Sequence, residues 1–145
     1  MKPLKLITLG VCALTCLVMP RASEAARTVW DPIDVDLMEL VAVDYEQGKK
    51  LPKRIRKLDG EEIRLEGYMS IDTQEGDTQF YLTFDSCGCN AAKVHHFVVV
   101  TLTDDETRYT PGKIQIEGTF SVGEKMDDFG FVESIYRLEA ESYDI

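Results

Sequence analysis

Residues 62–71, with the sequence EIRLEGYMSI, decide the fold class of this chain. Every second residue in this stretch is apolar or glycine, and the residues between them are mostly charged or polar. Because successive side chains of a β-strand point to opposite faces, the alternation predicts a strand with one buried and one solvated face. The residues expected on the buried face are Ile63, Leu65, Gly67, Met69 and Ile71.

Four later stretches also predict strands, and the nearly all-apolar second of them is expected at the centre of the sheet. They are residues 78–84 (TQFYLTF), 94–103 (VHHFVVVTLT), 113–122 (KIQIEGTFSV) and 134–143 (SIYRLEAESY). Gly67 and Gly118 lie inside two of the five strands, and interior glycines mark bends of a closed sheet. The sequence therefore predicts a mainly β fold, a small five-stranded OB-like barrel, with a β-sandwich as the alternative.

The chain begins with the pattern of a secretory signal peptide. A short basic start is followed by an uncharged apolar run at residues 6–19, a proline and a set of small residues. This three-part layout predicts a signal peptide at residues 1–25, cleaved after Ala25, because the apolar run is short for a membrane span. An uncleaved anchor is the alternative, and Cys12 and Cys16 leave with the segment if it is cleaved.

The β domain is expected over residues 59–145. Residues 26–58 are expected to form an N-terminal segment that leads into it. This segment contains a short helix at residues 37–46, for which Asp34 or Asp36 can provide the N-cap. A basic stretch at residues 49–57 (KKLPKRIRK) follows. We interpret it as a solvated linker rather than a docking patch, since runs of charge are usually solvated.

The charge balance excludes some classes of partner. The net charge is −10, and removal of residues 1–25 would change it to −12. A strongly acidic protein is a poor match for nucleic acid or for an anionic lipid surface, whereas it attracts cations. We therefore expect no nucleic-acid partner and a mature protein that is not embedded in a membrane.

The residues most able to carry chemistry are clustered. Residues 85–90 (DSCGCN) contain Cys87 and Cys89, and both histidines of the chain, His95 and His96, follow closely. If the strands on either side pair as a hairpin, the thiols lie near one of the histidines. Only one of the two histidines can lie on the same side of the sheet as the thiols, because neighbouring residues of a strand face opposite sides.

Three interpretations of this cluster are open. The first is a zinc or copper site formed by Cys87, Cys89 and one histidine, with Asp85, water or the second histidine as fourth ligand. The second is a disulfide between the cysteines, which an oxidising compartment favours and the very small loop opposes. The third is a pair of thiols and two strand histidines without a function.

An enzyme is not expected. No ordering of serine, histidine and acid stands out, and a Cys–His nucleophile would need a thiolate that the acidic surface disfavours.

Residues 58–69 (LDGEEIRLEGYM) resemble the opening signature of the secreted bacterial family named domain of unknown function 3299. Further features occur in the order that this family shows. They are Trp30 before this stretch and, after it, the strand at 80–84, the cysteine loop, residues 98–102 and residues 117–119. The resemblance implies an OB-like fold and the periplasm of a Gram-negative cell, and it assigns no function.

The chain departs from the family in the cysteine loop. The family has a cysteine, one residue, a histidine and then a proline-rich run, whereas here Cys89 stands in the place of that histidine. Residues 90–93 (NAAK) replace the prolines. Since cysteine and histidine share metal binding above other chemistry, the exchange favours a metal site.

Together these observations predict an exported periplasmic binding or accessory protein. It would bind zinc or copper through Cys87, Cys89 and a histidine, His95 or His96, and work with a transport-system component or another envelope protein. The alternatives are a thiol-disulfide protein that uses Cys87 and Cys89, and a non-catalytic protein-interaction module.

Overall fold

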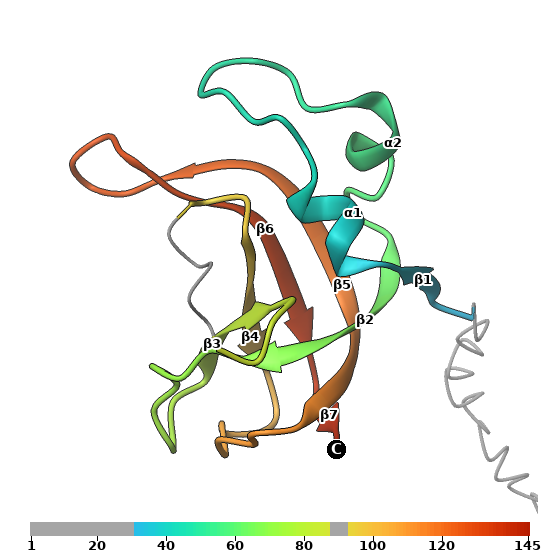
Figure 1. Ribbon diagram of the computed structural model, residues 1–145, viewed down its shortest axis with the longest axis vertical. Coiled ribbons are helices and arrows are strands. Elements are labelled where there is room, and N and C mark those ends of the chain that lie inside the picture. The colour runs from blue at the N-terminus through green and yellow to red at the C-terminus, as the bar shows by residue number, and fades with distance from the viewer. Residues whose placement is uncertain (1–30, 88–92) are drawn as a thin grey trace, which may run out of the picture.

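The chain forms a mainly β protein with two short helices (Figure 1). The computed structural model describes residues 31–87 and 93–145. The predicted signal peptide, Trp30 and Cys89 lie outside these residues. No helix in the described ranges is long and apolar enough to cross a membrane.

Seven strands and two helices follow one another along the described chain. In order they are β1 (Ile33–Val35), α1 (Leu37–Val41), α2 (Lys53–Arg56), β2 (Glu62–Met69), β3 (Gln79–Thr83), β4 (Phe97–Leu102), β5 (Lys113–Met126), β6 (Val132–Ala140) and β7 (Tyr143–Asp144).

The strands form one mixed sheet whose central part closes on itself. The strand order is β1-β2-β3-β4-β6-β5-β7, and an additional pairing joins β2 to β5. The strands β2, β3, β4, β6 and β5 therefore make a closed ring of pairings. Within the ring only β4 and β6 are parallel, and the remaining pairs are antiparallel.

The alternating residues of β2 and β5 face the inside of the ring, as the sequence predicts. The buried residues of these two strands include Ile63, Leu65, Met69, Ile114, Ile116 and Phe120. The prediction for Ile71 is wrong: its side chain is 63% exposed. The reason is that β2 ends at Met69, so the alternation no longer governs the residues of the following turn.

The segment before β2 packs against the ring and pairs with it. Leu37, Leu40 and Ile55 are buried in the core that the ring encloses, and β1 pairs in parallel with β2. The hydroxyl of Tyr136 on β6 donates a hydrogen bond to the carbonyl of Leu40 at 3.1 Å. Thus α1 is fixed to the ring by apolar contacts and by a buried hydrogen bond.

Two sequence predictions for this segment need correction. The helix expected over residues 37–46 spans only Leu37–Val41, although Asp36 caps it as expected by accepting from the Met38 amide at 2.9 Å. The basic stretch at 49–57 is not only a solvated linker. It contains α2, and Ile55 on this helix is buried because it covers the core while its cationic neighbours stay exposed.

Gly67 and Gly118 lie where backbones approach most closely. A Cβ atom on Gly118 would lie 2.1 Å from the carbonyl oxygen of Glu139, and one on Gly67 would lie 2.7 Å from that of Thr83. No side chain fits at such distances from a backbone atom. Both glycines thus lie at crowded points of the ring of strands.

Candidate functional site

The connection between β3 and β4 brings Cys87, His95 and His96 to one end of the ring. The two strands pair as a hairpin, with Thr83 opposite Phe97 and Leu82 opposite Val98. The chain thus leaves the ring after Thr83 and returns to the same place at Phe97. Cys87 and the two histidines belong to this connection, and so does Cys89, which lies outside the described residues.

The two histidines lie in a turn rather than in a strand. The strand predicted from residue 94 begins only at Phe97, and the amide of His96 donates to the carbonyl of Lys93 at 2.8 Å. As a result the strand alternation, from which the sequence analysis expected the two histidines to face opposite ways, does not apply to them. His95 is the buried histidine, with 9% of its surface exposed, and His96 is half-buried.

His95 packs against two rings. The centroid of its ring lies 4.4 Å from that of His96, edge to face, and 5.7 Å from that of Tyr45. Its Nδ1 atom is buried and has no hydrogen-bond partner in the described part of the chain. Burial lowers the pKa of His95, and the neighbouring His96 and Lys93 lower this pKa further. The imidazole is consequently held in its neutral form, the form that binds metal ions.

Tyr45 links this connection to β5. Its hydroxyl donates to Oε1 of Glu124 at 2.9 Å, and the same oxygen accepts from the Gly48 amide at 2.7 Å. Burial, together with the hydrogen bond to Glu124, raises the pKa of Tyr45 to about 12. The phenol therefore stays protonated near neutral pH and remains a hydrogen-bond donor.

Cys87 lies at the surface of the same connection. It is exposed, and its thiol donates to Oδ1 of Asp85 at a sulfur–oxygen distance of 3.7 Å. Thr83 holds the start of the connection through a bond from its hydroxyl to the Asp85 carbonyl at 3.0 Å. Over residues 31–87 and 93–145, no three His, Cys, Asp or Glu side chains form a group that could hold a metal ion. The site of Cys87, Cys89, His95 and His96 therefore stays a prediction.

A separate hollow of about 480 Å³ runs along β5 and β7. Carboxylates of Glu62, Glu117 and Glu139 line it together with hydroxyl and amide side chains, and none of the predicted site residues does. The ligand-rich connection and this hollow are thus different parts of the surface.

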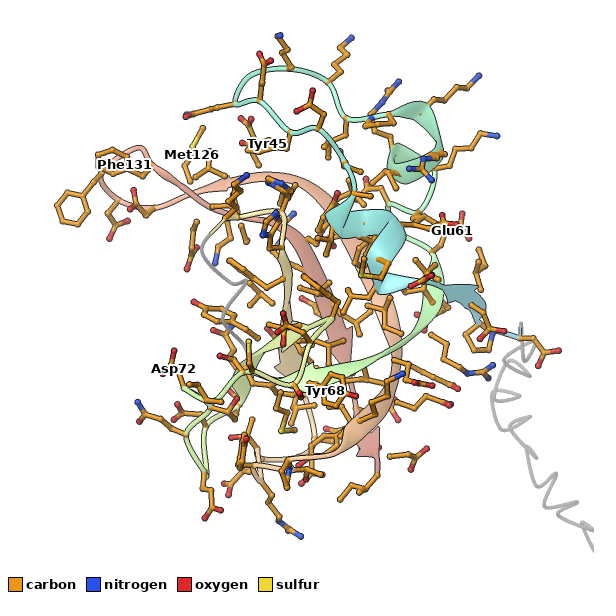
Figure 2. The ribbon with its side chains drawn as sticks, in the orientation of Figure 1. Tyr45, Glu61, Tyr68, Asp72, Met126 and Phe131 are labelled. Carbon is orange, nitrogen blue, oxygen red and sulfur yellow. The ribbon has the colours of Figure 1, made fainter. Side chains whose placement is uncertain are left out.

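Sequence reasoning missed one further feature, the hairpin that joins β5 to β6. Strand β5 continues to Met126, and residues 127–131 (DDFGF) form the tip, on which Phe129 and Phe131 are exposed. Figure 2 shows Phe131 and Met126 on this hairpin, away from the body of the ring. Two phenylalanines within a turn rich in aspartate and glycine were the available signal.

The structural comparison identifies a similar fold. The structure resembles the crystal structure of a DUF3299 family protein from Pseudomonas aeruginosa PAO1, with a TM-score of 0.53 and 17% sequence identity. The match covers 78% of this chain and 95% of that protein. The resemblance expected from the sequence is thus confirmed at the level of fold. No family model matches the chain, and no curated protein does.

Proposed function

We propose that this protein is an exported binding protein that holds zinc or copper at the β3–β4 connection and is not an enzyme. Cys87, Cys89 and His95 would supply three ligands, with His96, Asp85 or water as the fourth. It would act in the periplasm, where it would exchange the ion with a transport component or another envelope protein.

The observation that carries the proposal is the buried Nδ1 atom of His95, which has no partner among the described residues. A buried polar atom without a hydrogen bond costs about 1–3 kcal/mol, so such an atom calls for a partner such as an ion or a water. A metal ion would satisfy this nitrogen. His95 also belongs to the same connection as Cys87, on which the sequence places a second thiol two residues later.

The charge of the molecule supports a cationic ligand. The chain carries a net charge of −10, so its surface concentrates cations from solution. Thiolates and neutral imidazoles select zinc or cuprous copper from among those cations.

We also infer that the closed ring is an OB-like barrel. The ring strands β2, β3, β4, β5 and β6 can be numbered one to five in chain order. Their order around the ring is then one, two, three, five, four and back to one. The third and fifth strands are the parallel pair. This arrangement, together with the crowded Gly67 and Gly118, supports a small closed barrel with connections available for binding.

The proposal is tested by isothermal titration calorimetry, in which zinc or cuprous ion is titrated into the reduced, metal-free protein. We expect binding of one ion per chain. His95→Gln and Cys87→Ser should each weaken the affinity at least about tenfold, since even residues that only orient ligands contribute that much.

Two matched variants sharpen this test. Ser86→Ala changes a neighbour of Cys87 without removing a metal-binding group, and it should leave the affinity unchanged. Cys89→Ser should weaken binding as much as Cys87→Ser does. A reduced protein that binds neither ion would refute the metal function and leave the thiol-disulfide and interaction alternatives.

A further inference from the structure

The β5–β6 hairpin exposes more apolar surface than its position requires. Phe129 is 87% exposed, Phe131 is 71% exposed and the adjacent Met126 is 46% exposed. Full burial of one such side chain stabilises a folded protein by about 1.5–3 kcal/mol. In this short segment three apolar side chains stay exposed and do not contribute that stabilisation in full. Aromatic residues and methionine are also the types enriched at protein interfaces.

Hydrogen bonds of Asp127 hold the tip of the hairpin. Oδ1 of Asp127 accepts from the amides of Phe129 and Phe131 at 2.9 and 2.8 Å. The Asp127 amide donates to the Phe131 carbonyl at 2.8 Å, and Gly130 completes the turn with a φ of +83°. The two phenyl rings are therefore carried on an ordered backbone, so a partner that binds them orders little new structure.

The hairpin rises from the ring at a bulge in β5. Pairing with β6 shifts register between Val122 and Lys125, and Gly123 at this point has a φ of +140°, which suits glycine. The guanidinium of Arg137 donates to the Gly123 carbonyl at 2.8 Å and holds the bend. Figure 1 shows the result: the hairpin projects beyond the body of the ring at the upper left.

The charges around the rings restrict what can cover them. Asp127 and Asp128 lie in the tip, and Glu124 and Glu133 flank it. Lys125 is the one cation of residues 124–133, and it pairs with Glu133 at 2.9 Å. An anionic membrane would repel this acidic tip. A second copy of a chain with a net charge of −10 is also unfavourable.

We propose that the hairpin is a docking element for another protein, one that offers an apolar pocket rimmed by lysine or arginine side chains. Phe129 and Phe131 enter the pocket, where well-packed aromatic side chains carry most of the binding energy of an interface. Asp128 faces the cationic rim and favours encounter with the correct partner.

A synthetic amphipathic helix of leucine and lysine serves as the probe, because it presents an apolar stripe between two cationic edges. Binding of the labelled peptide to the full exported protein is followed by fluorescence anisotropy. The double variant Phe129→Ser, Phe131→Ser should weaken binding at least about tenfold. Ile71→Ser, a control at an apolar side chain with 63% exposure outside the hairpin, should leave binding unchanged.

The charge requirement is tested separately. Asp128→Lys should weaken binding of the leucine–lysine peptide several-fold, whereas Asp72→Lys makes the same change of charge elsewhere and should have a smaller effect. A leucine–glutamate peptide of the same pattern should not bind. Thermal midpoints equal to that of the wild type show that each variant is folded.

Three results would overturn the proposal. The first is equal weakening by Ile71→Ser and by the double phenylalanine variant, which would mean non-specific attraction. The second is binding of phosphatidylcholine vesicles that depends on Phe129 and Phe131, which would make the occupant a lipid surface. The third is self-association in sedimentation experiments that these phenylalanines control, which would make it a second copy of the chain.

Discussion

Two connections at the same end of the ring depart from ordinary burial in opposite ways. Strands β4 and β6 are parallel neighbours, so the connection that enters β4 and the hairpin that enters β6 lie at one end. The first buries the imidazole nitrogen of His95 without a partner in the described residues, and the second exposes the rings of Phe129 and Phe131.

The two proposals assign a different kind of ligand to each connection. A buried lone pair suits a small cation, whereas a pair of exposed phenyl rings suits an apolar pocket on another protein. Tyr45 stands between the two regions, because it packs against His95 and donates to Glu124 at the base of the hairpin. Neither departure stabilises the isolated chain: the unpartnered nitrogen is expected to lower its stability, and the exposed rings are expected to leave it nearly unchanged.

The largest expected effect comes from breaking the ring that supports both regions. Gly118→Ala places a Cβ atom 2.1 Å from the carbonyl oxygen of Glu139, and backbone cannot yield there as a flexible side chain can. We expect the free energy of unfolding to fall by about 3 kcal/mol, measured by urea denaturation. Gly112→Ala is the control, since its Cβ would meet nothing within 4 Å. Equal effects of the two variants would mean that Gly118 is incidental.

A smaller effect of opposite sign is expected at His95. Replacement by leucine in the metal-free protein removes the unpartnered Nδ1 atom and keeps an apolar body in its place. The free energy of unfolding should rise by about 1 kcal/mol. His96→Leu, at the half-buried neighbour, should give a smaller gain. A clear loss of stability in His95→Leu would show that the imidazole is held by interactions that favour folding.

The lowered pKa of His95 predicts how stability changes with pH. The unfolded chain takes up a proton near pH 6.5, whereas the folded chain resists it to lower pH. The neutral form of His95 therefore supports folding at pH values above the pKa that His95 has in the unfolded chain. This support is lost as the pH falls through the lower pKa that His95 has in the folded chain. Urea midpoints of the metal-free protein should decline over this range more steeply than those of His95→Leu. Parallel curves for the two proteins would contradict the assignment.

The smallest effect on stability is expected at the hairpin tip. Phe129→Ser and Phe131→Ser remove side chains that are 87% and 71% exposed, so the free energy of unfolding should change by less than about 0.5 kcal/mol. Asp127→Ala is the matched comparison and should cost more, because Asp127 accepts two backbone amides. A large loss in the phenylalanine variants would mean that the rings serve the fold rather than a partner.

The parts of the fold that follow strict alternation were predictable from the sequence. Ile63, Leu65 and Met69 on β2 are such cases. Alternation carries no information where the strand has ended, which is why Ile71 was placed wrongly.

The sequence proposes residues for the candidate site, and these stay a prediction, but it does not give the geometry of the connection that carries them. His95 is buried because a turn at Lys93 rotates the chain before β4 begins, and no periodicity records such a turn. The hairpin was missed for a similar reason. A bulge at Gly123 lets β5 run on to Met126, and a bulge depends on pairing with β6 rather than on local sequence.

The central claim is that the β3–β4 connection binds a metal ion through Cys87, Cys89 and a histidine. The most direct measurement is elemental analysis of the exported protein, purified without a metal-affinity tag, together with titration of thiols after unfolding. The claim predicts about one zinc or copper ion per chain and two thiols that react without a reductant. No metal, and thiols that react only after reduction, would contradict it and assign the two cysteines to a disulfide.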